Sequence, residues 1–201
     1  FLRYKGEGLA DDGKAEAAVP ILQQAIALQE KTGSGTTPPL VLFNALGKAF
    51  AYLGRYRDAA ATFSRAAALQ GGTTGAASAS TVVGNLALVN AWSGDYPEAL
   101  RLFREAIASM DKAGVPADDA MRRVNERNHA SALILAGDYP KAKSELSRLR
   151  QRAREVDGMD SNEYLQTTIR LAMLARRMRD PAAGQPLLDE AKRLLDRKAP
   201  N

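Results

Sequence analysis

Three stretches of this 201-residue chain repeat one another and decide its fold: LGRYRDAAATFSRAA (53–67), SGDYPEALRLFREAI (93–107) and AGDYPKAKSELSRLR (136–150). In each stretch a Gly is followed by a Tyr two residues later, an Ala five residues later and a bulky apolar residue nine residues later. Weaker copies begin at Gly13 and Arg179, so successive copies are offset by 41, 40, 43 and 42 residues. Self-similarity at such a fixed period indicates a repeat architecture.

The residues before each turn Gly indicate that a helix precedes the turn. Ahead of the first stretch, Phe43, Leu46 and Phe50 are spaced so that they share one face of a helix. Gly47 lies on the same face, and later copies have a small residue in its place: Ala87, Ala130 and Ala172. A small residue is expected where two helices cross closely. Each copy is therefore predicted to be a helix, a turn and a second helix, with the turn Gly in a left-handed conformation.

Segments rich in Gly, Pro, Ser and Asp separate the copies and predict loops and helix starts. We expect helices over residues 15–32, 38–53, 56–70, 77–93, 97–113, 117–136, 139–156, 160–178 and 182–197, with a weak helix over 1–11. The fold class is therefore all-α: an α-α superhelix of about five helix-turn-helix repeats, in a single array over residues 1–201. The repeats are assigned to residues 1–35, 36–75, 76–115, 116–158 and 159–198.

This arrangement resembles the tetratricopeptide repeat family, in a long-repeat type similar to kinesin light chains and bacterial regulators. The family motif is matched by Phe43, Leu46, Gly47, Phe50, Gly54, Tyr56, Ala59, Phe63 and Ala66. The period of about 42 residues is longer than the family's usual period of about 34. Three residues depart from the motif: Glu126 and Thr168 take apolar positions, and Arg179 takes the place of a turn Gly.

In proteins of this family the first helix of each pair lines a concave groove, so the resemblance implies where a partner binds. The expected groove residues are Asn44, Lys48, Tyr52, Asn85, Leu88, Trp92, Arg127, Asn128, Ser131, Arg170, Met173 and Arg177. Asn can donate and accept hydrogen bonds, as an extended backbone requires, and the resemblance implies this role for Asn85 and Asn128. Aromatic side chains are enriched at binding hot spots, and Arg pairs with carboxylates.

Structural roles are the alternative for several of these residues. Asn85 and Asn128 could cross-link neighbouring helices, and Trp92 could pack between repeats. The basic residues at 176–179 could be a solvated helix end. The run RLRQRAR (148–154) is predicted to be the outer face of a second helix.

The composition lacks the side chains that most catalytic sites need. There is no Cys, and the single His, His129, takes a position where the motif has Leu, so we interpret it as a core residue. No Gly-rich phosphate loop or Ser/His/Asp set is present, and acidic pairs such as Asp118–Asp119 are interpreted as helix caps. We therefore expect no catalytic residue, no metal site, no cofactor and no enzyme activity.

The net charge of +5 lies entirely in residues 101–201, which hold 20 Lys and Arg against 15 Asp and Glu. This excess favours an acidic partner. Few aromatic residues lie among the arginines, which argues against specific nucleic-acid recognition. No window approaches about 18 uncharged apolar residues, so no transmembrane segment is predicted.

The sequence therefore predicts a protein–protein interaction scaffold that binds an extended or helical peptide segment in its concave groove. The alternative is a peptide- or ligand-sensing regulatory module of a bacterial kinase or transcription regulator. The chain starts at Phe1 without a Met, which favours a piece of a larger bacterial protein, and a cytoplasmic location is favoured. Leucines on the last predicted helix favour a homo-oligomer formed through terminal helices: Leu187, Leu188, Leu194 and Leu195.

Overall fold

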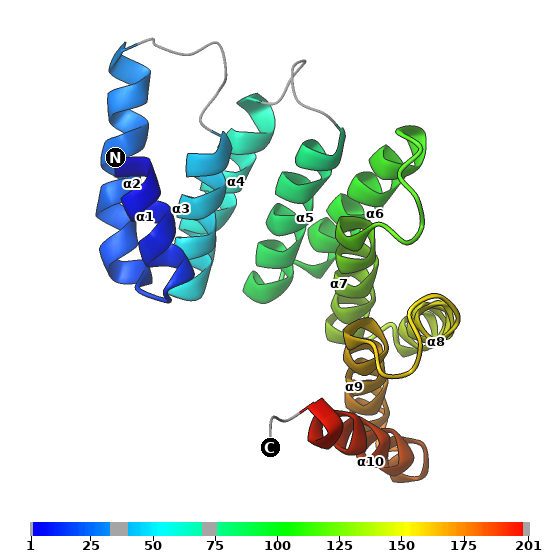
Figure 1. The fold of residues 1–201 in the computed structure, drawn as a ribbon. Helices are drawn as coiled ribbons and strands as arrows, with labels where there is room; N and C mark the ends of the chain where they lie inside the picture. Colours follow the sequence, from blue (N-terminus) through cyan, green and yellow to red (C-terminus); the bar gives the residue numbers. More distant parts are fainter. Residues whose placement is uncertain (1, 33–39, 70–75, 199–201) are drawn as a thin grey trace. The chain divides into compact units, whose positions relative to one another are not determined.

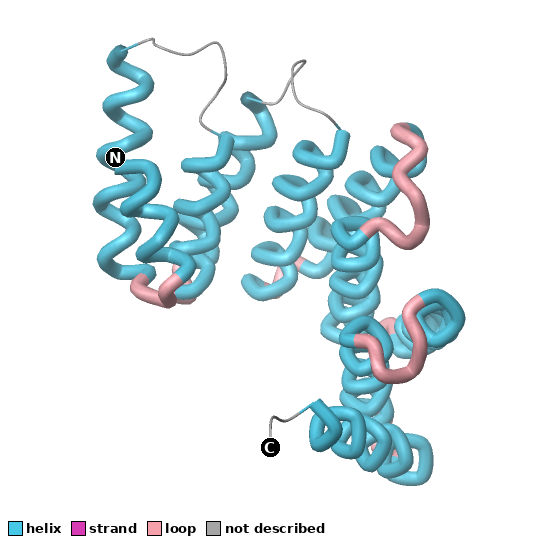
Figure 2. Tube along the Cα trace, in the orientation of Figure 1, coloured by secondary structure: helices cyan, strands magenta, loops and turns pink. Residues whose placement is uncertain are grey.

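The computed structural model describes residues 2–32, 40–69 and 76–198, and every regular element within these ranges is an α-helix (Figures 1 and 2). The helices are α1 (Leu2–Asp11), α2 (Ala15–Thr32), α3 (Leu40–Tyr52), α4 (Tyr56–Leu69), α5 (Ala76–Ser93), α6 (Tyr96–Lys112), α7 (Ala120–Ala136), α8 (Tyr139–Val156), α9 (Asn162–Arg177) and α10 (Pro181–Lys198). Their bounds confirm the predicted helices to within three residues. Predicted helix positions 1, 38–39 and 70 lie outside the described residues.

The chain forms two compact units, residues 1–115 (unit 1) and residues 116–201 (unit 2). In unit 1 consecutive helices from α1 to α6 pack against each other, and in unit 2 the same holds from α7 to α10. The boundary falls between the third and fourth predicted repeats. Each unit therefore holds whole helix pairs: three in unit 1 and two in unit 2 among the described residues. The single array over residues 1–201 stays a prediction.

Short-range polar contacts start the helices where the breaker segments predict. The carboxylate of Asp119 accepts hydrogen bonds from the backbone N–H groups of Met121 (2.9 Å) and Arg122 (3.0 Å) at the start of α7. The hydroxyl of Ser161 accepts one from the N–H of Tyr164 (3.2 Å) at the start of α9. Such caps satisfy N–H groups that have no partner inside the helix. The interpretation of Asp119 as a cap is confirmed.

The turn between the two helices of a pair requires a residue with positive φ. Gly137 ends α7 in the left-handed conformation, with φ of 82°, and its N–H donates to the carbonyl of Ile134. Arg179, which replaces Gly in the last copy, keeps the same backbone geometry with φ of 57°. A side chain in this conformation is strained. The last turn therefore follows the repeat geometry despite its sequence.

The core of unit 1 is aromatic and aliphatic. The predicted packing residues Phe43, Leu46 and Phe50 are buried together with Phe63. Gly47 lies against the Phe63 ring, where an added Cβ would lie only 2.7 Å from two ring carbons. The close crossing of α3 and α4 that the small residue predicts is confirmed.

The core of unit 2 instead contains buried polar side chains. Glu126, His129 and Thr168 all take motif positions that are buried, and His129 is buried as predicted. The His129 Nδ1 atom lies 2.9 Å from a carboxylate oxygen of Glu145 on α8. The hydroxyl of Thr168 donates to the carbonyl of Tyr164 at 2.8 Å. Polar groups can occupy these positions because each is hydrogen-bonded.

No helix in the described part of the chain is both long and apolar enough to cross a membrane.

Candidate binding site

All of the predicted groove residues lie on the first helices of their pairs. In unit 1 they lie on α3 and α5, and in unit 2 they lie on α7 and α9. The structure therefore brings them together in two groups. One group belongs to unit 1 and the other to unit 2.

The asparagines of unit 1 bind each other. The side-chain amide of Asn85 on α5 donates to the side-chain oxygen of Asn44 on α3 at 2.8 Å. The two residues are 41 positions apart, which is one repeat. For Asn85, though not for Asn128, the alternative that the asparagine cross-links neighbouring helices is confirmed.

The aromatic residues of unit 1 differ in their surroundings. Trp92 packs against Tyr56 of α4, with ring centroids 5.9 Å apart and planes tilted by 47°. This contact supports the alternative that Trp92 packs between repeats, although the residue is still 45% exposed. Tyr52 is 71% exposed, Lys48 is exposed and Leu88 is half-buried. Tyr52, Lys48 and the exposed part of Trp92 therefore form the accessible part of this group.

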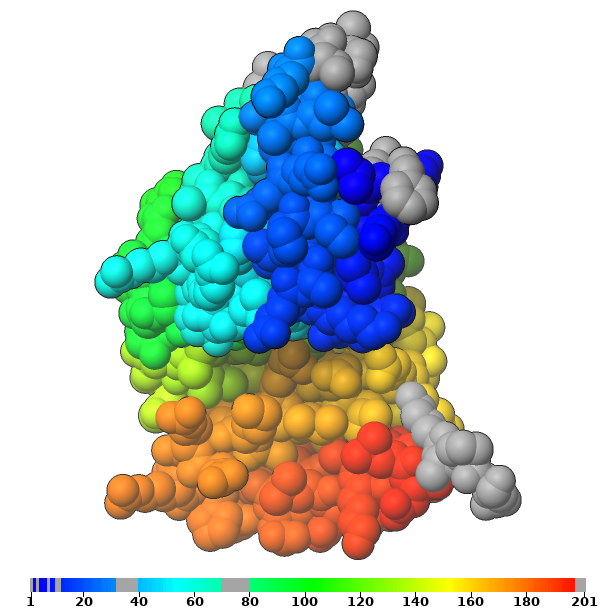
Figure 3. Space-filling view, turned by 90° about the vertical axis from the view of Figure 1, so that its left-hand side faces the viewer, coloured from blue at the N-terminus to red at the C-terminus, as the bar shows by residue number. Residues whose placement is uncertain are grey.

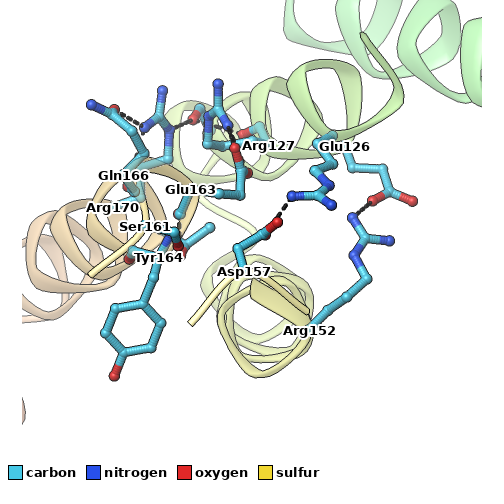
Figure 4. A network of polar contacts seen from close by, with 12 residues as sticks. Glu126, Arg127, Arg152, Asp157, Ser161, Glu163, Tyr164, Gln166 and Arg170 are labelled. Carbon is cyan, nitrogen blue, oxygen red and sulfur yellow. Dashed lines mark hydrogen bonds and ion pairs between the residues drawn. The ribbon is translucent and has the colours of Figure 1, made fainter. Parts of the chain in front are cut away.

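The unit 2 group is organised by two arginines and one glutamate (Figure 4). One guanidinium nitrogen of Arg127 on α7 donates to both carboxylate oxygens of Glu163 on α9, at 2.7 and 2.5 Å. Arg170 on α9 donates from Nε to the hydroxyl of Ser131 on α7 at 3.0 Å. Its Nη1 donates to the backbone and side-chain oxygens of Gln166, at 3.2 and 3.0 Å. Arg127, Ser131 and Arg170 are thus brought together between the two first helices.

Positive charge is in excess at this cluster. Arg127 has a carboxylate partner, but the hydrogen-bond acceptors of Arg170 among the described residues are all neutral. Burial and the neighbouring cation of Arg127 lower the pKa of Arg170 to about 10, and the Glu163 carboxylate only partly opposes this. Arg170 remains protonated at neutral pH, so the α7–α9 face holds a partly buried cation without a matching anion.

Further predicted residues lie near this cation. Asn128 is half-buried, and its side-chain amide makes no hydrogen bond to another described residue. It lies three residues before Ser131 and therefore on the same face of α7. Met173 is 58% exposed and Arg177 is exposed, at three and seven residues after Arg170 along one face of α9. The face therefore offers amide, apolar and cationic groups side by side.

Sequence reasoning overlooked the acidic partner in this site. Glu163 lies in the first turn of α9 and forms an ion pair with Arg127. Its position in the first helical turn is the signal that could have found it, because an acidic residue there is favoured by the helix dipole. Gln166 also contacts Arg170 but is absent from the predicted groove residues, and it lies one turn before Arg170 on the same helix face.

The arginine run 148–154 is only partly the outer face that the sequence predicts. Arg152 forms an ion pair with buried Glu126 (Figure 4). Arg122 also approaches this carboxylate, at 3.4 Å. Arg150 binds Tyr164 at 2.6 Å, and also Thr168 and Glu190. Arg150 and Arg152 are therefore partners of the polar core, and Arg148 also lies 3.7 Å from a carboxylate oxygen of Glu126. The prediction of an outer face holds for exposed Arg154 but not for half-buried Arg150 and Arg152, because the motif's two polar substitutions need hydrogen-bonding partners.

The basic residues at the end of α9 are solvated. Arg176, Arg177 and Arg179 are all exposed. The alternative of a solvated helix end is therefore confirmed for this segment. Of the three arginines, Arg177 lies on the same face of α9 as Arg170.

Comparisons with known proteins identify the repeat. Residues 81–110 match the tetratricopeptide repeat family. These residues cover most of α5 and α6, the third helix pair. No curated protein matches the chain.

Solved structures show the same fold over nearly the whole chain. Putative kinesin light chain repeats of Podosopora anserina, described as nearly identical tetratricopeptide-like repeats, superpose with a TM-score of 0.81 at 19% identity, covering 100% of this chain and 96% of that one. A variant of the same protein gives 0.83 at 20% identity, covering 98% and 94%. BtubC of P. vanneervenii gives 0.76 at 16% identity, covering 98% and 80%. The chain therefore has the fold of tetratricopeptide-like repeats, as the resemblance implies.

Proposed function

We propose that this chain of tetratricopeptide-type helix pairs holds an acidic, extended segment of a partner protein against the first helices of its pairs. The fold and the repeat match support the general role of a protein–protein interaction scaffold. The acidic chemistry of the partner and its place on the α7–α9 face are the finer part of the proposal. They are carried by one observation: the partly buried Arg170 cation has no carboxylate partner among the described residues.

An acidic group of the partner would bind at Arg170. The Nη2 atom of Arg170 makes no hydrogen bond to the described residues, so a carboxylate can accept from it without breaking an existing contact. A charge-assisted hydrogen bond is roughly twice as strong as a neutral one. The unpaired amide of Asn128 can bind the partner's backbone beside it, and Met173 offers apolar contact.

The two asparagines that the resemblance singles out have different roles in this proposal. Asn85 is held by Asn44, so its main contribution is to fix α3 against α5. Asn128 is the one available for a ligand. We therefore expect that Asn128→Ala weakens partner binding by about 1–3 kcal/mol, whereas Asn85→Ala acts first on stability.

Two pools of fluorescent peptides test the proposal. One pool carries Asp and Glu at fixed positions with a free C-terminal carboxylate, and the matched pool carries Asn, Gln and a C-terminal amide. Fluorescence anisotropy should show tighter binding of the acidic pool to the wild-type chain, and Arg170→Gln should remove most of this preference. Arg193→Gln, at an exposed position on the second helix α10, removes the same charge and should leave the preference intact.

Equal binding of the two pools would contradict an acidic partner. An equal loss of preference in Arg170→Gln and Arg193→Gln would mean that net charge, not the α7–α9 face, selects the acidic pool. Circular dichroism of each variant checks that the helices are retained.

Self-association through the last helix stays a separate proposal. Leu188 and Leu195 lie two turns apart on one face of α10, and their side chains are 52% and 51% exposed. A second copy could cover this stripe. Light scattering should then report a concentration-dependent increase in mass that Leu195→Glu abolishes, and a constant monomer mass would contradict the proposal.

A further inference from the structure

A pocket in unit 1 is lined by none of the predicted groove residues, and the proposed function does not use it. Its volume is about 450 Å³, and it is lined by α2, α3 and α4. Both α2 and α4 pack against α3. In Figure 3 α2 appears in blue beside the cyan of α4 on one face of the molecule. Small-molecule sites usually have volumes of roughly 300–1,000 Å³.

The floor of the pocket is aromatic. Phe43, Leu46 and Phe50 come from three successive turns of α3, and Ile26 closes the floor from α2. These side chains are all at least 95% buried, so the floor belongs to the rigid core of the unit. Aromatic floors favour flat aromatic ligands, because offset or tilted ring pairs add to the free energy of apolar burial.

Two guanidinium groups lie directly over this floor. The Arg55 Cζ atom lies 4.5 Å from the centroid of the Phe50 ring, and the Arg65 Cζ atom lies 5.0 Å from that of Phe43. Their carboxylate partners are Asp58, at 2.7 Å, and Glu30, at 2.6 Å. All four side chains are about half exposed, with values from 46% to 58%. Exposed ion pairs of this kind contribute little to stability, so a ligand's acidic group can compete for the arginines.

We propose that the pocket between α2, α3 and α4 binds a small aromatic acid, whose acidic group binds Arg55 or Arg65 in place of Asp58 or Glu30 and whose rings replace that guanidinium group on the face of Phe50 or Phe43. The charged groups over the floor rings are both cations, and their carboxylate partners Asp58 and Glu30 also line the pocket. An acidic ligand can therefore bind by taking the place of one of these carboxylates. The Glu30–Arg65 pair joins α2 to α4 across the pocket, so a ligand that engages Arg65 also acts on the spacing of two helices. Such a site suits a ligand-sensing module.

Two fluorescent probes test the proposal in the full chain. The anionic probe is 8-anilinonaphthalene-1-sulfonate, and the neutral probe is N-phenyl-1-naphthylamine, which has the same rings without the sulfonate. Fluorescence titration should give one site with the anionic probe bound about tenfold more tightly than the neutral one, as charge-assisted hydrogen bonds predict. The double variant Arg55→Gln, Arg65→Gln should lose this difference and keep the affinity for the neutral probe within about twofold.

A pair of variants on α2 locates the site. Ala27 is exposed and lines the pocket, so Ala27→Phe should fill it and weaken both probes by about tenfold or more. Ala17 is equally exposed on the same helix but lies outside the pocket, so Ala17→Phe is the matched control and should bind both probes normally. Circular dichroism verifies that both variants fold.

Three results would overturn the proposal. Wild-type affinity of both probes in Ala27→Phe would mean that they bind elsewhere. Equal affinity of the two probes for the wild-type chain would remove the acidic part of the ligand. Retention of the preference for the anionic probe in the double arginine variant would mean that other charges hold the sulfonate.

Discussion

The two units of this chain are built on the same helix pair but hold it together by different chemistry. Unit 1 contains all five Phe residues of the sequence, and Phe43, Phe50, Phe63 and Phe103 are buried in it. Unit 2 contains no Phe. Among its described buried residues are a carboxylate, Glu126, and several other polar side chains. One repeat geometry therefore accommodates an apolar core and an ion-paired one.

The difference shows that the repeat geometry requires these positions to be buried but does not require them to be apolar. Burial of apolar area is non-directional, so any well-filled apolar position supports the helix crossing in unit 1. An ionised side chain at the same position requires a partner of opposite charge, because desolvation is costly. Glu126 has this partner in Arg152, and Thr168 accepts a hydrogen bond from Arg150 at 3.0 Å. Each of these polar residues on a first helix of unit 2 is thus bound by an arginine of α8.

The largest expected effect tests the apolar core. Phe63→Ala removes a side chain that is 1% exposed and leaves a cavity beside Gly47, so it should destabilise unit 1 by about 4 kcal/mol. Hydrogen–deuterium exchange measures the amide exchange rate of each helix separately and should show faster exchange in α3 and α4. Ala61→Gly, at an exposed position on α4, is the mild control. Unchanged protection of α3 would contradict a core role for this ring.

The next effect tests the charged core. Glu126→Ala leaves Arg152, Arg122 and Arg148 without their shared carboxylate and should destabilise unit 2 by about 3 kcal/mol. The double variant Glu126→Leu, Arg152→Leu should recover much of this loss, because it removes an unpaired charge and fills the space with apolar atoms. Urea unfolding followed by circular dichroism measures both. A double variant less stable than the single one would show that the pair is worth more than its apolar replacement.

A smaller change in stability is expected from substitutions at the turn between the two helices of a pair. Arg179→Gly relieves the strain of a side chain at positive φ and should raise stability by about 0.5–1 kcal/mol. Gly137→Ala places a side chain in the same conformation and should lower stability by a similar amount. Thermal unfolding of both variants would show shifts of opposite sign. A stability loss in Arg179→Gly would mean that its side chain makes a favourable contact.

The smallest effect concerns the binding face. Burial depresses the pKa of Arg170 in the folded chain to about 10, which is below its pKa in the unfolded chain. At a pH between these two pKa values, the unfolded chain therefore binds more protons than the folded chain. The charge therefore costs stability at neutral pH, and this cost falls as pH rises through about 10. Arg170→Gln should be as stable as the wild type at pH 7 or slightly more so, and this advantage should shrink at alkaline pH. A clear loss of stability at pH 7 would make Arg170 a structural residue.

Much of the fold could be predicted from local pattern. The period of the Gly-x-Tyr copies predicted the helix pairs, and Gly47 predicted a close crossing that the Phe63 contact confirms. The site was less predictable. Asn44, Asn85 and Asn128 look alike in sequence, but Asn85 is bound to Asn44 and Asn128 is available. That difference depends on which side chains neighbouring helices bring within hydrogen-bond distance.

The amino-acid sequence by itself determined where the helices begin, turn and end, because caps, left-handed turns and apolar spacing act over a few residues. Only the tertiary structure decided which charges are satisfied. Arg127 and Arg170 are both basic residues on first helices, but Glu163 pairs with one, while the other is left with neutral acceptors. Electrostatic pairing depends on distances between helices about one repeat apart, and a linear pattern does not contain those distances.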